Sequence, residues 1–132
     1  MEKNTIRKKI LIIEDNTDIV ELYTLYFEEK NFEVFTSFDG IKGITEILEK
    51  RPDIVLLDIM MPQMNGFEVL EVITKQSSIE IPIVVCSNLS QESDIRKAIS
   101  LGAKTYITKS DFEISEIVET TIKVLQDFYK ES

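Results

Sequence analysis

Charged and polar side chains end several of the apolar runs in this sequence. They are Glu14, Asp15, Asp58, Ser87 and Lys109. Asp58 is the most unusual of them, because the four residues before it, 54–57, are all apolar. A carboxylate at the end of such a run is costly to bury unless another group pairs with it. The sequence therefore indicates that Asp58 has partners elsewhere in the chain.

The chemistry open to these side chains depends on whether they meet. The carboxyl ends of parallel strands lie at one edge of a sheet, which is where such sheets bind ligands. Three carboxylates gathered there would repel one another, and a hard divalent cation relieves that repulsion. Oxygen ligands without nitrogen or sulfur favour Mg²⁺. With a lysine as a mobile positive charge and a serine hydroxyl as a donor, the group suits phosphoryl transfer, in which a carboxylate can be the nucleophile.

Strand and helix patterns alternate along the chain and would position these side chains. Apolar strand patterns occupy residues 9–14, 32–37, 53–57, 81–86 and 105–108. Helical spacing of apolar residues occupies 17–30, 40–51, 65–76, a short stretch after Ser90 that ends at Leu101 and Gly102, and a last stretch after Ser110. Five such units with continuous apolar strands predict a parallel sheet with helices on both faces.

Helix starts and buried helix faces can also be predicted. Asn65 with Glu68 fits a capping box in variant form. Ser110 with Glu113 fits a second box, and Ser90 fits an N-cap. The apolar faces expected of the first two helices consist of Ile19, Leu22, Tyr23, Tyr26 and Phe27, and of Ile41, Ile44, Ile47 and Leu48.

Length and composition limit the classes of protein to which the chain can belong. The 132 residues suit one domain with one core. No apolar run approaches the roughly 20 residues of a transmembrane helix and no signal-peptide pattern follows the N-terminus, so we expect a cytoplasmic protein without a membrane partner. The net charge of −9 argues against nonspecific binding to nucleic acid, and we expect no nucleic-acid partner. Cys86 is the only cysteine and histidine is absent, which excludes an internal disulfide and the commonest general base.

Four motifs give the chain a resemblance to a known family. They are "LIIEDN" at 11–16, "LLDIMMPQMNG" at 56–66, "VVCSN" at 84–88 and "GAKTYITKSDF" at 102–112. Together they make residues 8–128 resemble the receiver domain of two-component response regulators, most closely the single-domain chemotaxis (CheY-like) type. The resemblance implies an α/β fold, a doubly wound (βα)5 flavodoxin-like three-layer sandwich with parallel strand order 2-1-3-4-5. It also implies one receiver domain over residues 1–132 and no output domain.

The resemblance further implies roles for the acidic residues. Asp58 would be the phosphoacceptor, forming an aspartyl-phosphate. Asp15 and Asp58 would bind Mg²⁺ through their carboxylates, together with the backbone carbonyl of Met60. Glu14 would act on the metal through a water molecule, and it stands where aspartate is commoner in the family. Its additional methylene group can still reach a metal-bound water.

Other residues would hold and sense the phosphoryl group. By the resemblance, Ser87 and Lys109 would bind its oxygens, and Tyr106 would be an aromatic switch that turns inward when the serine moves toward the phosphate. Met60 and Leu89 stand two residues after the phosphoacceptor and the hydroxyl, where they flank the path of the water that removes the phosphoryl group. Because neither side chain can orient water and both are apolar and bulky, we expect a long-lived phosphorylated state.

Two further positions depart from the family pattern. Asn88 stands where a small residue is usual beside the hydroxyl, so Tyr106 has less room to turn inward. Ser110 follows Lys109 where a proline in a cis peptide bond is usual. A cis bond before serine costs roughly 2.5–4 kcal/mol. Either local contacts impose that bond, or the bond is trans and Lys109 sits differently.

The resemblance favours one function over two alternatives. A histidine kinase or histidine phosphotransfer protein would donate a phosphoryl group to Asp58, and the face of the fourth helix, fifth strand and fifth helix would change its affinity for a target protein. Such a switch, a monomer or weak dimer, is no enzyme beyond its own phosphorylation and dephosphorylation. A phosphate-independent interaction module on the same fold stays open because of Asn88 and Ser110. A phosphatase of the haloacid dehalogenase type would need an aspartate where Met60 stands.

Overall fold

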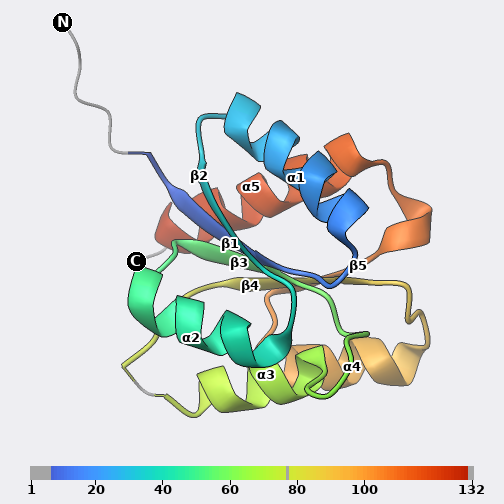
Figure 1. Ribbon diagram of the computed structural model, residues 1–132. Coiled ribbons are helices and arrows are strands. Elements are labelled where there is room, and N and C mark those ends of the chain that lie inside the picture. Colours follow the sequence, from blue (N-terminus) through green and yellow to red (C-terminus); the bar gives the residue numbers. More distant parts are fainter. Residues whose placement is uncertain (1–6, 77, 131–132) are drawn as a thin grey trace, which may run out of the picture.

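The computed structural model describes residues 7–76 and 78–130, in which strands and helices alternate (Figure 1). The strands are β1 (Lys9–Ile13), β2 (Glu33–Ser37), β3 (Ile54–Leu57), β4 (Ile83–Ser87) and β5 (Thr105–Thr108). The helices are α1 (Thr17–Glu29), α2 (Gly40–Lys50), α3 (Gly66–Thr74), α4 (Glu92–Ser100) and α5 (Ile114–Lys130), and a 3₁₀ helix, η1 (Lys109–Asp111), joins β5 to α5. Each predicted strand and helix is present, with small shifts at the ends.

The five strands of the described ranges form one parallel sheet in the order β2-β1-β3-β4-β5. The chain starts at β1, adds β2 on one side, and then adds β3, β4 and β5 on the other. Strand order therefore reverses between β1 and β3, where such sheets bind their ligands. Figure 1 shows α1 and α5 on one face of the sheet and α2, α3 and α4 on the other. The predicted doubly wound, three-layer α/β fold is confirmed.

Side chains of each strand alternate between two layers of core. On β1, Leu11 and Ile13 join the core under α2, α3 and α4, whereas Ile10 and Ile12 join the core under α1 and α5. All four are fully buried. A sheet covered on both faces explains why its strands are continuously apolar. Among the helices that the structure describes, none combines the length and the apolar character needed to cross a lipid bilayer.

The buried face of α1 differs in part from the predicted one. Tyr23 and Phe27 are buried as expected, and Val20 completes the seam on the sheet. Leu22 and Tyr26 were expected in this face but are exposed. Residues 20, 23 and 27 have the i, i+3, i+7 spacing of a single helical stripe. The prediction was wrong because it widened that stripe by including neighbouring apolar residues.

The buried face of α2 contains glycines that the apolar pattern does not reveal. Ile47 is buried as expected, but Ile41 and Leu48 are exposed, and Gly40 and Gly43 are buried in their place. A Cβ atom on Gly43 would lie 2.5 Å from the side chain of Ile13 in β1. The helix therefore approaches the sheet on its glycine side, which turns two of the predicted core residues toward solvent.

The predicted start of α3 is confirmed, whereas the predicted start of α4 is wrong. The Asn65 side chain accepts the Glu68 N–H at 3.0 Å, and the Glu68 carboxylate accepts the Asn65 N–H at 2.9 Å, so the capping box of α3 is present. Ser90 is not a cap, because Gln91 occupies the N-cap position of α4 and makes no side-chain capping bond. Acidic residues in the first turn, beginning with Glu92, suit the positive end of the helix dipole instead.

The predicted capping box of the last helix is also wrong. Ser110 lies inside η1, and α5 begins only after Glu113. The backbone N–H of Glu113 donates to the carboxylate of Glu116 at 2.8 Å. The short 3₁₀ turn follows β5 at once and delays the start of the helix, and it begins at Lys109, whose side chain belongs to the site described next.

Candidate functional site

The carboxyl ends of β1 and β3 lie side by side and bring acidic residues together. Ile13, the last residue of β1, pairs with Leu57, the last residue of β3. The backbone N–H of Asp58 donates to the Ile13 carbonyl at 2.9 Å, and the N–H of Glu14 donates to the Ser37 carbonyl at 3.0 Å. These backbone hydrogen bonds fix the positions of Glu14 and Asp58 independently of any contact between their side chains.

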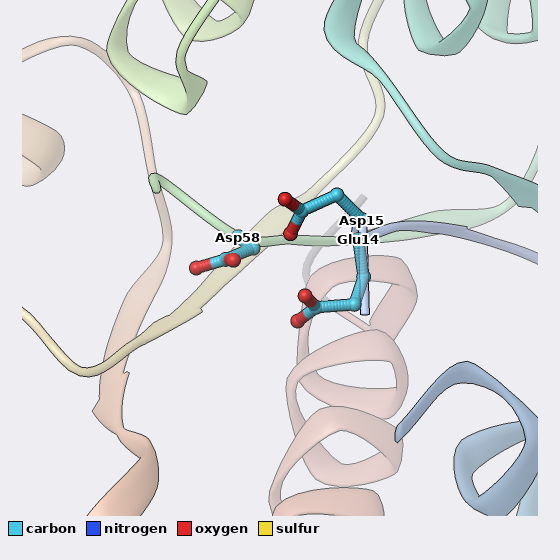
Figure 2. A group of neighbouring side chains, drawn as sticks. All are labelled: Glu14, Asp15 and Asp58. Atoms are coloured by element: carbon cyan, nitrogen blue, oxygen red, sulfur yellow. The ribbon is translucent and has the colours of Figure 1, made fainter. Parts of the chain in front are cut away.

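Three carboxylates, those of Glu14, Asp15 and Asp58, converge at this edge of the sheet (Figure 2). One oxygen atom from each lies within 4.8 Å of the other two. Glu14 and Asp58 are buried, whereas Asp15 is exposed. The structure therefore gathers the acids that the sequence places at the strand ends, and it leaves one of them open to solvent.

Lys109 reaches the acidic group from the end of β5. Its ammonium nitrogen lies 2.6 Å from Glu14 Oε1 and 3.6 Å from Asp58 Oδ2, and its side chain is only 13% exposed. Burial alone would lower the pKa of Lys109, but the hydrogen bond to Glu14 and the charge of Asp58 raise that pKa above its ordinary value. The ammonium group therefore stays charged beside the carboxylates.

The Lys109–Ser110 peptide bond is trans, as is every other peptide bond in the part of the chain that the structure describes. Of the two alternatives that Ser110 left open, the trans bond is therefore the one found. Lys109 begins η1 and still directs its ammonium group to Glu14 and Asp58. The 3₁₀ turn thus places this lysine at the acidic group.

Ser87 ends β4 and is fully buried at the start of a chain of hydrogen bonds. The backbone N–H of Leu89 donates to Ser87 Oγ at 3.3 Å, and the Tyr106 hydroxyl donates to the Leu89 carbonyl at 2.6 Å. Burial raises the pKa of Tyr106, and the neighbouring Ser87 hydroxyl offsets part of that effect. These hydrogen bonds connect Ser87, at the carboxyl end of β4, through the Leu89 backbone to the side chain of Tyr106 in β5.

The loop after Asp58 folds back on it before α3 begins. The Met60 N–H donates to Asp58 Oδ1 at 3.3 Å, and the Gly66 N–H donates to the Ile59 carbonyl at 2.9 Å. A Cβ atom on Gly66 would lie 2.5 Å from the Asp58 carbonyl oxygen, so any larger residue would displace this backbone. The Met60 side chain is 53% exposed, whereas Leu89 is partly buried against the core.

Two residues that shape the site are not among the predicted site residues. The backbone N–H of Asn16 donates to Glu14 Oε2 at 3.1 Å, and its side chain accepts the Ile19 N–H as the N-cap of α1. An asparagine directly before a helical pattern is a recognisable capping signal. Gly66, by contrast, follows Asn65 in a pair that signals only a turn or a helix start. Its close approach to Asp58 depends on tertiary contacts.

The donor atoms of the site fit a hard divalent cation. Burial raises the pKa of the Glu14 carboxyl, the Lys109 hydrogen bond offsets part of the rise, and the charge of Asp58 adds to it. A cation among these oxygens would relieve the repulsion between them. Oxygen donors with solvent on one side, at Asp15, match Mg²⁺, which keeps several of its waters. Asp15, Asp58 and the Met60 carbonyl could hold such an ion.

Known proteins match the chain over most of its length. The family model described as "Response regulator receiver domain" matches residues 10–121. The DNA-binding response regulator MtrA of Mycobacterium tuberculosis is 34% identical over 115 residues, which make up 87% of this chain and 49% of MtrA. The chain therefore spans about half the length of the curated relatives it matches.

Solved structures have the same fold. The phosphorylated cyanobacterial phytochrome response regulator RcpA superposes with a TM-score of 0.79 at 29% identity, over 96% of this chain and 97% of that one. The CheY-like response regulator receiver domain protein of Methanospirillum hungatei superposes with a TM-score of 0.87 at 23% identity, over 96% and 100% of the two chains. Because the Methanospirillum hungatei protein is only 23% identical to this chain, its similarity shows a shared fold alone.

Proposed function

This chain belongs to the response regulator receiver domain family, and from that premise we propose that it is a phosphorylation-dependent signalling switch. Receiver domains are signalling modules rather than conventional enzymes. In the proposal, residues 8–128 act as one receiver domain that accepts a phosphoryl group on Asp58 with Mg²⁺. Its chemistry is limited to its own phosphorylation and dephosphorylation.

The position of Asp58 is the observation that carries the proposal. The Asp58 carboxylate is buried and lies 3.6 Å from the charged ammonium of Lys109. One of its oxygen atoms also lies within 4.8 Å of an oxygen atom of Glu14 and of an oxygen atom of Asp15. The transition state of phosphoryl transfer spreads negative charge over three oxygens, so a nucleophile beside a fixed cation and metal-binding oxygens suits that reaction.

In the proposed reaction, a carboxylate oxygen of Asp58 attacks the phosphorus of a phosphohistidine on a donor protein. The O–P bond forms as the P–N bond breaks, and the electron pair of the broken bond stays on the imidazole nitrogen, which takes a proton from solvent. Lys109 and Ser87 bind the phosphoryl oxygens, by charge and by hydrogen bonding. Mg²⁺, when bound, supplies further charge neutralisation at those oxygens.

The donor in this proposal is a histidine kinase or a histidine phosphotransfer protein, and the receiver of the signal is a target protein. The path from Ser87 through Leu89 to Tyr106 supports a route from the phosphoryl group to the face formed by α4, β5 and α5. A shift of Ser87 toward a phosphoryl oxygen would alter the Leu89 backbone and therefore the hydrogen bond that holds the Tyr106 hydroxyl. The affinity of that face for its target would change with it.

Intact mass spectrometry after incubation with acetyl phosphate and Mg²⁺ tests the proposal. We expect a gain of one phosphoryl group that requires Mg²⁺ and is absent in Asp58→Asn. Asp111→Asn, at an exposed aspartate in η1, is the matched control and should behave as the wild type. Absence of phosphoryl uptake by the wild type would instead favour a phosphate-independent interaction module on the same fold.

A further inference from the structure

The outer side of β2, turned away from β1, is flanked by two hollows in the protein surface. In the ranges that the structure describes, β2 pairs with β1 on one side and with no strand on the other. A hollow of about 480 Å³ lies on the α1 face of the sheet, and one of about 300 Å³ lies on the opposite, α2 face (Figure 1). Thr36 and Phe38 line both hollows. We propose that this β2 edge binds an extended, basic segment of another protein as an additional strand.

Alternate residues of β2 direct their backbone groups to the β2 edge. The N–H of Glu33 and the carbonyl of Ser37 hydrogen-bond, at 2.8 and 3.0 Å, to the backbone at the two ends of β1. Successive residues of a strand direct these groups to opposite sides, so those of Val34 and Thr36 point away from β1. Residues 34–37 contain no charged residue and no proline, which are the usual protection of an exposed strand. The backbone is therefore open to pairing.

The hollow on the α1 face would receive every second side chain of an added strand. Val34 and Thr36 line this hollow, so the same two residues offer both their backbone groups and their side chains to the partner. Leu25 and Phe38, which also line it, are 60% and 45% exposed. Burying this apolar surface would stabilise the complex. Side chains such as valine suit this side of the added strand.

The hollow on the α2 face would receive the intervening side chains. Polar residues make up most of its lining, namely Ser37, Lys42, Thr45 and Glu46 beside Thr36. The buried hydroxyl of Ser37 has no hydrogen-bond partner within the described part of the chain. Since a buried hydroxyl without a partner is costly, a side chain that can hydrogen-bond suits this side. Together the two hollows favour a partner in which valine-like and threonine-like residues alternate.

The charge of α1 favours a basic partner. The charged residues of this helix are all acidic and all exposed, namely Asp18, Glu21, Glu28 and Glu29. Glu21 lines the larger hollow itself. Lysine or arginine beside the apolar residues of the partner would complement these charges. A second copy of this chain would instead place a like-charged α1 against the first, with a net charge of −9 on each copy, so the partner is a different protein.

Binding at the β2 edge goes beyond the proposed function. Strands β2 and β5 form the two opposite margins of the sheet. A partner on β2 would therefore leave the face of α4, β5 and α5 free for its target. Because neither hollow is lined by Asp58 or Lys109, the partner should also bind the unphosphorylated protein.

Titration with a capped synthetic peptide of sequence KKVTVTVKK, at low ionic strength and without Mg²⁺ or phosphodonor, tests the proposal. We expect saturable changes in amide chemical shifts, with the largest changes and slower hydrogen exchange at the N–H groups of Val34 and Thr36. The peptide EEVTVTVEE should bind at least about tenfold more weakly. The proposal is overturned if these two amides do not respond, or if the two peptides bind equally. A response of the same amides to protein concentration alone would also overturn it, by showing that a second copy occupies the β2 edge.

Thr36→Lys tests the location of binding, and Thr105→Lys is its matched control. Both residues are partly exposed threonines in strands at the margins of the sheet. Lysine at position 36 would fill the larger hollow and repel the basic peptide, so its affinity should fall at least about tenfold. Thr105→Lys, with the same change in charge, should bind the peptide as wild type does. Equal effects of the two substitutions would place the binding elsewhere.

Glu21→Lys tests the charge preference at a position on the surface of α1, where the fold of β2 is not at risk. It should weaken binding of KKVTVTVKK and strengthen binding of EEVTVTVEE. Glu80→Lys, at an exposed acid that lines neither hollow, makes the same change in net charge and should keep the preference of wild type. If both variants shifted the preference equally, only the overall charge of the protein would attract the peptide, and the β2 edge would have no specific role. Thermal unfolding by circular dichroism confirms that each variant is folded.

Discussion

At the scale of the residue, the buried carboxylate of Asp58 is a source of instability as well as chemistry. It is 5% exposed and lies among two other carboxylates, and its favourable contacts are long, at 3.3 Å to the Met60 N–H and 3.6 Å to the Lys109 ammonium. Asp58→Asn is nearly isosteric and removes one of the repelling charges. Without Mg²⁺, we expect the variant to unfold at a temperature a few degrees higher than wild type, as about 1 kcal/mol produces in a chain of this size. A lower midpoint, measured by circular dichroism, would show that the Lys109 contact outweighs the repulsion.

Also at the residue scale, Met60 and Leu89 are predicted to slow loss of the phosphoryl group. Water must approach in line with the phosphorus, opposite the Asp58 oxygen, and neither side chain can orient it by hydrogen bonding. We expect Met60→Asn to lose phosphate severalfold faster than wild type. Leu89→Glu should have a smaller effect, because Leu89 is partly buried against the core whereas Met60 is 53% exposed.

The measurement is the decay of the phosphorylated mass after the donor is removed, for wild type, both single variants and the double variant. Thermal unfolding of each variant serves as the control, since a polar residue at position 89 also reduces packing. Equal decay rates in all four proteins would mean that the two side chains only extend the packing of their loops.

At the scale of the element, the end of α2 contains a strained residue. Arg51 has a φ of 49° and a ψ of 61°, in the left-handed region that disfavours residues with a Cβ atom, and it is followed by Pro52. Its N–H still donates to the Ile47 carbonyl and closes the helix. We expect Arg51→Gly to raise the free energy of unfolding by about 0.5–1 kcal/mol. Glu49→Gly, inside the same helix and also exposed, should lower it by a similar amount. Urea denaturation of the two variants checks both signs.

The sequence alone predicts some features of the helices and strands but not others. The acids after β1 and β3 could be predicted to meet, because parallel strands leave no other place for their carboxyl ends. The start of α4 could not be located, since Ser90, Gln91 and Glu92 follow one another and only tertiary packing selects among them. The sequence pattern also does not predict the 3₁₀ turn at Lys109, because the contact of this side chain with Glu14 is a tertiary contact between residues far apart in the chain.

At the scale of the whole molecule, Mg²⁺ should act in two separable ways. The net charge of −9 means that any added salt screens repulsion within the fold. Binding at the acidic edge adds a specific term, which reaches roughly 1.4 kcal/mol when Mg²⁺ is tenfold above its Kd. We therefore expect MgCl₂ to raise the thermal midpoint more than NaCl does at the same ionic strength. The additional stabilisation by MgCl₂ should shrink as the pH falls toward the ordinary carboxyl pKa values of about 4, because protons compete with the metal for the carboxylates.

Asp15→Asn distinguishes these two effects of Mg²⁺ on stability. The substitution removes the one exposed carboxylate of the site but changes the net charge by only one unit in nine. The variant should therefore keep the response to NaCl and lose the additional response to MgCl₂. Glu116→Gln, an exposed acid on α5 far along the chain from this edge, makes the same change in net charge and should keep both responses. If Asp15→Asn retained the MgCl₂ excess, Mg²⁺ would be stabilising the fold from somewhere other than the ends of β1 and β3.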